Sequence, residues 1–342
     1  MSHAFLQNAW YVLIGILLVG YAVLDGFDLG VGVLSPFIAK NEKERQVLVS
    51  AIGPFWDGNE VWLLTAGGAL FAAFPNVYAT VFSGFYLALM LVLYALIVRA
   101  VSFEFGHRVE SARWRRVWDW VFFAGSLLPA LLTGVAVGNV MRGVPLDARG
   151  EFAGDFFSLL NPFALVVGLA GLSMFIMQGA AYLTAKTNGD LARRARGAGI
   201  WAWTALVVLL IVAGVLVVAD SPERLDNYTR NPLAYIVPLA ALAFLILTRV
   251  SLQKGTGGKA FLFSSLAVAA IMGIWGVANY PYLLPARNVA AYGLTAFNAS
   301  ASQKSLQTMF IIALVGMPLV LAYTAYVYWI FRGKVRAHEE HY

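Results

Sequence analysis

Four acidic residues stand in two short motifs where the surrounding sequence is apolar. Asp25 and Asp28 belong to YAVLDGFDLGVG, residues 21–32, and Asp57 and Glu60 belong to FWDGNEVW, residues 55–62. A charged side chain near the centre of a bilayer costs at least about 2.5 kcal/mol on the mildest insertion scales. Acids at that depth indicate a proton relay, a cation site or pairing with basic side chains.

The spacing within each pair is i, i+3, which places both members on one face of a helix. If the first helix ends near residue 38 and the second begins near residue 47, Asp28 and Asp57 each lie ten residues, about 15 Å, from the cytoplasmic side. Asp25 and Glu60 then each lie about 20 Å from it. Because the connecting loop is short, we expect the two pairs to be level. Four carboxylates at one depth cannot all ionise, so shared protons are the expected state.

Basic partners for these acids are scarce in the sequence. Arg99, at the end of the third apolar segment, is the nearest candidate, and we expect no Lys or Arg deep in a span. Arg99 is interpreted as an anchor that extends its charge to the cytoplasmic surface, or as a contact for a partner subunit. Salt bridges within the chain are therefore a weak explanation for the presence of these acids in apolar segments. Trp56 is interpreted as a packing residue, with positioning of Asp57 as the alternative.

A structural alternative applies to the same motifs. Asp and Asn side chains beside glycine can hydrogen-bond a kinked helix or a neighbouring backbone without any further role. We favour a functional interpretation because four acids occur together at membrane depth.

The elements that must position these residues are membrane helices. Of the 342 residues, 60% are hydrophobic and 12% are charged. Successive apolar segments exceed the roughly 20 residues that a spanning helix needs. The sequence therefore predicts an all-α polytopic membrane protein, and its first apolar run is too long for a signal-peptide core. We place nine spans, at about 8–38, 47–74, 77–101, 117–141, 161–185, 199–219, 231–249, 259–281 and 304–331.

Orientation follows from the basic residues. With nine spans and the N-terminus outside, 18 of the 24 Lys and Arg residues, Arg336 among them, fall on the cytoplasmic side. The positive-inside rule thus favours an N-out, C-in topology. The formal charge of +6 is typical of a cytoplasmic membrane face and calls for no nucleic-acid partner. Asn161-Pro162 and Asn231-Pro232 are expected to start the fifth and seventh spans, since Asn caps and Pro suits the first turn.

Haem ligands are missing from the predicted spans. The histidines are His3, His107, His338 and His341, all outside them, and the chain has no cysteine. Axial ligands of haem are usually His, Cys or Met, and the remaining candidates, Met174, Met177 and Met272, are expected to pack in the core. The chain is predicted to ligate no haem and to hold no metal.

Several motifs together resemble subunit II of cytochrome bd-type quinol oxidases. They are the DGFDLG and WDGNEVW motifs, RWRRVWDW at 113–120, NPFALVVGLAGLSMFIMQGAAYL at 161–183 and FLFSSLA at 261–267. The resemblance implies a single membrane domain over residues 1–342, made of two four-helix bundles, 1–145 and 155–285, and a peripheral helix and tail, 300–342. It also implies the bacterial cytoplasmic (inner) membrane as the location, and a place in the aerobic respiratory chain.

The same resemblance implies a partner, subunit I, that carries two b-type haems and one d-type haem and oxidises quinol. This chain would support that subunit and help to deliver cytoplasmic protons for the reduction of dioxygen to water. Asp57, Asp28 and Asp25 correspond to acids of the family motifs, while Gln is also found at the place of Glu60. Support at the subunit interface is expected from Arg99, Trp56 and Asn59.

Two alternatives stay open at this point. Paired intramembrane carboxylates also serve proton-coupled secondary transporters, although we find no pair of interrupted helices in corresponding halves. The other alternative is a purely structural membrane scaffold. A small accessory subunit, bound membrane lipids and bound quinone are further expected partners.

Overall fold

The computed structural model describes residues 1–106, 108–109 and 111–335. Interpretations that involve His107, Arg336, His338 and His341 concern residues outside this part of the chain. The helices of the first half are α1 His3–Ile38, α2 Glu42–Ile52, α3 Trp56–Ala73, α4 Pro75–Gly84, α5 Tyr86–Phe105 and α6 Ala112–Arg142. Those of the second half are α7 Pro162–Lys186, α8 Gly189–Asp220, α9 Asp226–Arg230, α10 Ile236–Lys254, α11 Gly257–Asn279 and α12 Gln303–Ile330.

Short elements complete the outer end of the molecule. The strands β1 (Tyr282–Leu284) and β2 (Leu294–Thr295) pair antiparallel. Single 3-10 turns cover Phe157–Leu159, Pro222–Leu225, Pro232–Tyr235 and Ala290–Tyr292. Asn161 and Asn231 accept backbone N–H groups at the start of their helical segments, from Ala164 and Leu233 respectively, which confirms the predicted starts of these two segments.

Within the described residues, eight helices are long and apolar enough to cross a membrane. The second predicted span, 47–74, is instead two helices, α2 and α3, and the third, 77–101, is α4 followed by α5. Pro54 follows Gly53 at the first break, where proline lacks the N–H that a continuous helix needs. The all-helical membrane fold is thus observed, while the count of nine spans and the N-out, C-in topology stay predictions.

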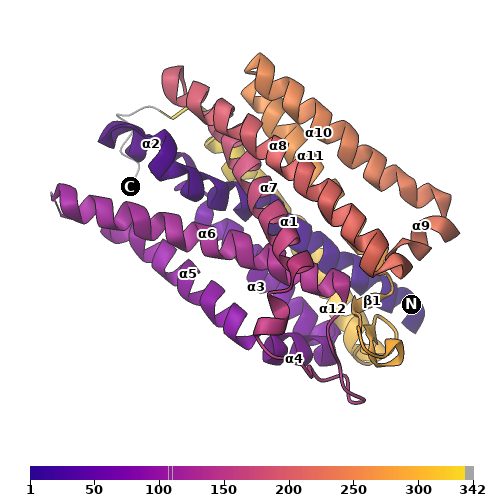
Figure 1. Ribbon diagram of the computed structural model, residues 1–342. Coiled ribbons are helices and arrows are strands. Elements are labelled where there is room, and N and C mark those ends of the chain that lie inside the picture. Colours follow the sequence, from indigo (N-terminus) through magenta and orange to yellow (C-terminus); the bar gives the residue numbers. More distant parts are fainter. Residues whose placement is uncertain (107, 110, 336–342) are drawn as a thin grey trace.

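The long helices run roughly side by side along one axis (Figure 1). In the first half α1 packs against α3 and α6, and α5 packs against α6. In the second half α7 packs against α8 and α11, and α10 against α11. Helices α1 and α6 also pack against α7, so one hydrophobic core runs through both halves. Met174 and Met177 lie in this core and Met272 packs against it, which confirms their predicted packing role.

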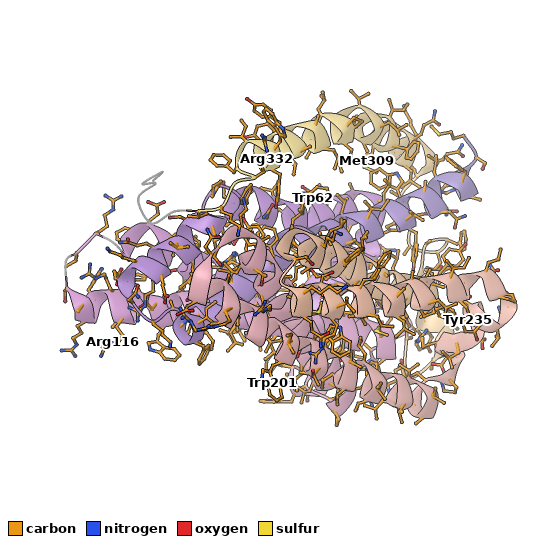
Figure 2. All side chains as sticks on the ribbon, turned by 90° about the horizontal axis from the view of Figure 1, so that it is seen from above. Trp62, Arg116, Trp201, Tyr235, Met309 and Arg332 are labelled. Atoms are coloured by element: carbon orange, nitrogen blue, oxygen red, sulfur yellow. The ribbon has the colours of Figure 1, made fainter. Side chains whose placement is uncertain are left out.

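The last helix, α12, lies on one side of the molecule, where it contacts α1 and α3 (Figure 2). It starts beside the N-terminus, because Gln303 donates a hydrogen bond to the carbonyl of Met1. Its other end reaches the end of α7, where the N–H of Val335 donates to the carbonyl of Lys186. Helix α12 is peripheral, yet both of its ends are tied to the rest of the fold.

Glycines allow the closest helix contact in the core, between α1 and α7. A Cβ added at Gly30 would lie 1.9 Å from the carbonyl oxygen of Phe175, and one added at Gly179 would lie 2.6 Å from the backbone of Gly30. Small residues permit such backbone approach in membrane proteins. This contact fixes the depth of the DGFDLG motif relative to α7.

Candidate functional site

Arg99 of α5 lies between two of the predicted acids. Its Nη1 atom is 3.1 Å from Oδ1 of Asp25 on α1 and 2.6 Å from Oε1 of Glu60 on α3. The side chains of Arg99 and Asp25 are fully buried, and that of Glu60 is 19% exposed. Gly125 of α6 lets this part of α5 pack closely, since a Cβ there would lie 2.9 Å from Cβ of Arg99. Three helices of the first half therefore meet in one ion-pair cluster.

This arrangement corrects the interpretation of Arg99 from the sequence. Arg99 is not a surface anchor, and salt bridging within the chain does occur, although both were predicted otherwise. Helix α5 continues to Phe105, six residues beyond Arg99, whereas the third span was expected to end near residue 101. Arg99 thus lies more than one turn before the end of α5. The prediction that Asp25 and Glu60 are level is confirmed, because one nitrogen atom contacts both.

Asp28 has a different partner. The Nδ2 group of Asn59 on α3 donates to Oδ2 of Asp28 at 2.7 Å and to the carbonyl of Leu24 at 3.1 Å. Asp28 is fully buried and Asn59 is 3% exposed. Asn59 was expected at the subunit interface, but in this chain it holds α3 against α1.

Asp57 does not join the buried cluster. It is exposed, in the first turn of α3, while Asn59 two residues later is buried. Three of the predicted acids thus face the helix contacts and Asp57 faces outward; because exposure does not measure depth, the level arrangement of Asp28 and Asp57 stays a prediction. Trp56 stacks on Phe103 of α5 with ring centroids 5.1 Å apart, which confirms packing as its role within the chain.

Several buried polar atoms of the cluster have no hydrogen-bond partner among the described residues. They are Oδ1 of Asp28, and Nε and Nη2 of Arg99, whereas the hydroxyl of Tyr21 lies within hydrogen-bonding reach of the Asp25 carboxyl group. Buried polar groups are nearly always satisfied by protein or ordered water, and a buried water typically bridges about three such groups. These atoms are therefore the positions in the cluster where ordered water would bind.

Two further residues reach the acid motifs and were not predicted. Gln178 of α7, fully buried, donates to the carbonyl of Val23 at 2.7 Å, and Tyr328 of α12 donates to Oδ1 of Asn59 at 3.2 Å. Gln178 could have been suspected as a polar residue deep in an apolar run. Tyr328 gives no such signal, because tyrosine is common near the ends of membrane helices.

The described donors do not suit haem or a metal ion. His3 is the one histidine in this part of the chain, and it is exposed at the start of α1. Met174 and Met177 are 5% and 0% exposed within apolar packing. The described residues contain no group of three or more His, Cys, Asp or Glu side chains that could hold a metal. We therefore assign no cofactor-dependent step to these side chains.

Comparisons with known proteins agree with the motifs. The family model described as cytochrome bd terminal oxidase subunit II matches residues 6–331. Cytochrome bd-I ubiquinol oxidase subunit 2 of Escherichia coli strain K12 is 39% identical over 365 residues, covering 98% of this chain and 96% of that protein. Cytochrome bd ubiquinol oxidase subunit 2 of Bacillus subtilis strain 168 is 38% identical over 339 residues, covering 98% of each.

A solved structure shares the fold. It is the bd oxidase from Geobacillus thermodenitrificans, with a TM-score of 0.74 and 17% identity over 96% of this chain and 98% of that one. At this identity the likeness shows the fold alone. Because the family model and close relatives both extend over nearly the whole sequence, the chain belongs to the cytochrome bd terminal oxidase subunit II family.

Proposed function

We propose that this chain is the haem-free subunit of a quinol:oxygen oxidoreductase and that it carries cytoplasmic protons towards the reduction of dioxygen. Family membership makes it a multi-pass membrane subunit of an oxidoreductase complex with a partner subunit I. The observation that carries the proton role is the buried network in which Asp28 contacts Asn59 while Asp25 and Glu60 share Arg99. Intramembrane ionisable groups are functional sites by default.

Each acid has a role that follows from its surroundings. Protons enter from the cytoplasm at the exposed Asp57, exchange with Glu60 one helical turn away, and reach the buried Asp28. Asp25 is held by Arg99 in a fully buried ion pair and mainly stabilises the cluster. Water between the unpartnered atoms of Asp28 and Arg99 provides the transfer path.

The haem groups and the quinol site are assigned to the partner, since the described donors of this chain do not suit an axial pair. When bound in subunit I, haem supplies electron transfer and oxygen reduction. This chain supports the haem-bearing subunit and delivers protons to it. We place the complex in the bacterial inner membrane, with the N-terminus outside, residues 1–145 and 155–285 as the two bundles, and residues 300–342 at the periphery.

A specific observation favours a second candidate, the structural scaffold. The Arg99 ion pairs connect α1, α3 and α5, which is what a purely supporting cluster would do. The two functions predict different losses. A scaffold residue, when changed, lowers the haem content of the complex, whereas a proton carrier lowers turnover at full haem content.

The test is Asp28→Asn and Asp57→Asn in the purified two-subunit complex. The amide keeps the size of the carboxyl group and can hydrogen-bond, but it cannot carry a proton. We expect quinol-driven oxygen consumption per haem to fall in each variant and almost to vanish in the double variant, since coupled acids partly replace one another. Asp226→Asn, at an exposed acid of α9, is the control. Full turnover at full haem content in the double variant would overturn the proton role.

A further inference from the structure

Tyr328 brings the peripheral helix α12 into contact with the acid motifs. Its hydroxyl donates to Oδ1 of Asn59 at 3.2 Å, and its ring packs on Phe55, with centroids 4.4 Å apart, and edge-on to Phe27 at 6.4 Å. The amide of Asn59 in turn donates to Asp28. A side chain on the outermost helix is thus two hydrogen bonds away from a fully buried carboxyl group.

The end of α12 is fixed in this position by Lys186. The ammonium group of Lys186 donates to the carbonyls of Phe331 and Gly333, and the carbonyl of Lys186 accepts the N–H of Val335. A cation at the C-terminal end of a helix is stabilised by the free carbonyls and the helix dipole. Because Tyr328 lies one turn before Phe331, the same contacts hold its hydroxyl in place.

We propose that Tyr328 is a positioning residue for proton release at Asp28, because it fixes the orientation of the Asn59 amide. The inference rests on the proposed proton-carrying role of Asp28. With Oδ1 accepting from Tyr328, the amide presents its NH2 group to Asp28. An amide locked this way donates to the carboxylate and offers no acceptor to the protonated acid.

The orientation of the Asn59 amide controls whether Asp28 releases its proton. A proton that has arrived from Glu60 leaves the carboxyl group of Asp28 for a water molecule on the way to oxygen reduction, and the carboxylate of Asp28 is restored with its hydrogen bond from Asn59. Without the tyrosine hydroxyl the amide can rotate and accept from protonated Asp28. Rotation gives up the bond from Nδ2 to the carbonyl of Leu24, at 3.1 Å, and replaces the bond from Nδ2 to Asp28 by one from the protonated acid to Oδ1. The proton is then retained on Asp28.

The other charged or titratable groups near Asp28 come from four elements, and Tyr328→Phe leaves their side chains in place, although Tyr182 lies near Tyr328 as well as near Asp28. They are Asp25 on α1, Glu60 on α3, Arg99 on α5 and Tyr182 on α7. A change in the pH dependence of turnover in Tyr328→Phe therefore reports the loss of the tyrosine hydroxyl.

The experiment compares Tyr328→Phe with Tyr326→Phe in the purified complex. Phenylalanine keeps the ring contacts of Tyr328, and the ring of Tyr326 is 57% exposed, on the outer side of the same helix. We expect Tyr328→Phe to lower turnover per haem about 2- to 10-fold, the range for one neutral hydrogen bond, and to change the shape of the pH profile. Haem content and thermal stability should match the parent, as should all properties of Tyr326→Phe.

Two further measurements tie the effect to Asp28. In an Asp28→Asn background, Tyr328→Phe should cause no additional loss of turnover, because the effects of substitutions at interacting residues are not additive. In infrared difference spectra, the protonated-carboxyl band that Asp28→Asn removes should shift in Tyr328→Phe. The inference is wrong if Tyr328→Phe has parental turnover at every pH, if its loss is undiminished in the Asp28→Asn background, or if haem is lost in proportion to turnover.

A different result would contradict the proposed proton-carrying role of Asp28. If Asp28→Asn itself keeps full haem and full turnover, Asp28 carries no proton in the reaction. The infrared band then still decides the positioning role: a shifted band supports the amide lock, and an unchanged band in Tyr328→Phe overturns it.

Discussion

Removal of the guanidinium from the buried cluster is the strongest single perturbation that this structure predicts. Arg99→Met keeps an apolar side chain of similar length but leaves Asp25 and Glu60 without a countercharge. Each hydrogen bond to a charged group contributes about 1.5–3 kcal/mol, and breaking a buried pair from one side typically costs about 3–5 kcal/mol. Because Glu60 is 19% exposed and can rehydrate, we expect about 3–5 kcal/mol rather than the full sum.

The compensating variant shows whether charge is the cause. Adding Asp25→Asn and Glu60→Gln to Arg99→Met makes the cluster neutral, and such neutral replacements of buried pairs are often tolerated. We expect this triple variant to recover most of the lost free energy of unfolding. The assay is a denaturant titration of the two-subunit complex in mixed micelles, with haem retention as the second readout.

The control for this series is Arg108→Met, at the exposed Arg108–Glu104 pair at the end of α5, where the change should be below about 0.5 kcal/mol. The reasoning is refuted if Arg99→Met unfolds at the parental denaturant concentration. It is also refuted if the triple variant is as unstable as the single one, since lost volume rather than charge would then be the cause.

Three further variants test the packing and the ion pairs at the two ends. Gly30→Ala should cost about 1–3 kcal/mol or more of unfolding free energy, because its Cβ meets backbone of α7, whereas Gly15→Ala, with nothing within 4 Å, should be neutral or stabilising. Glu44 is partly buried, which alone would raise its pKa, but the N–H of Lys40 and the guanidinium of Arg194 hold this pKa below its ordinary value. Its contribution is therefore present above the unfolded-state pKa and lost as pH falls through the folded-state pKa, so Glu44→Gln should destabilise the complex at pH 7 and not in strong acid. Asp220→Asn removes the negative charge that accepts two bonds of 2.9 Å from Arg287, whose pKa these bonds raise, and one of 3.1 Å from Arg142. It should cost about 1 kcal/mol in a thermal melt at low salt, and less at high salt.

The sequence predicted the class of fold and the family well, and the contacts of the site less well. Composition and apolar run length are sufficient for membrane helices, since the bilayer excludes unpaired backbone. The depth argument paired Asp25 with Glu60 correctly. It missed Arg99 as their partner because a charge looks peripheral when the span is expected to end two residues later, and the true end of α5 depends on packing against α6.

The hydrophobic periodicity of the sequence does not predict contacts between residues that lie far apart along the chain. Tyr328 lies 269 residues after Asn59, and their hydrogen bond depends on how α12 returns to the first half. Gln178 reaches Val23 only because Gly30 and Gly179 let α1 and α7 approach. Such contacts arise from the three-dimensional packing of whole helices, which a single sequence does not specify locally.

The break between α2 and α3 explains why two similar acidic motifs behave differently. Helix α1 is continuous through its motif, so Asp25 and Asp28 lie in mid-helix and depend on side chains of other helices for stabilisation. Helix α3 begins at Trp56, which puts Asp57 in a first turn, where free N–H groups and the positive end of the helix dipole stabilise a carboxylate.

A helix continuous over residues 47–74 would have removed that stabilisation from Asp57. Asn59 and Asp57 are two residues apart and so lie on opposite faces of α3, with Asn59 turned towards α1 and Asp57 facing outward. An exposed acid supported by a helix end can exchange protons with its surroundings, and a buried acid supported by an amide can hold one. Asp57 at the start of α3 is thus exposed and Asp28 in the middle of α1 is buried, which is the arrangement that the proposed proton path uses.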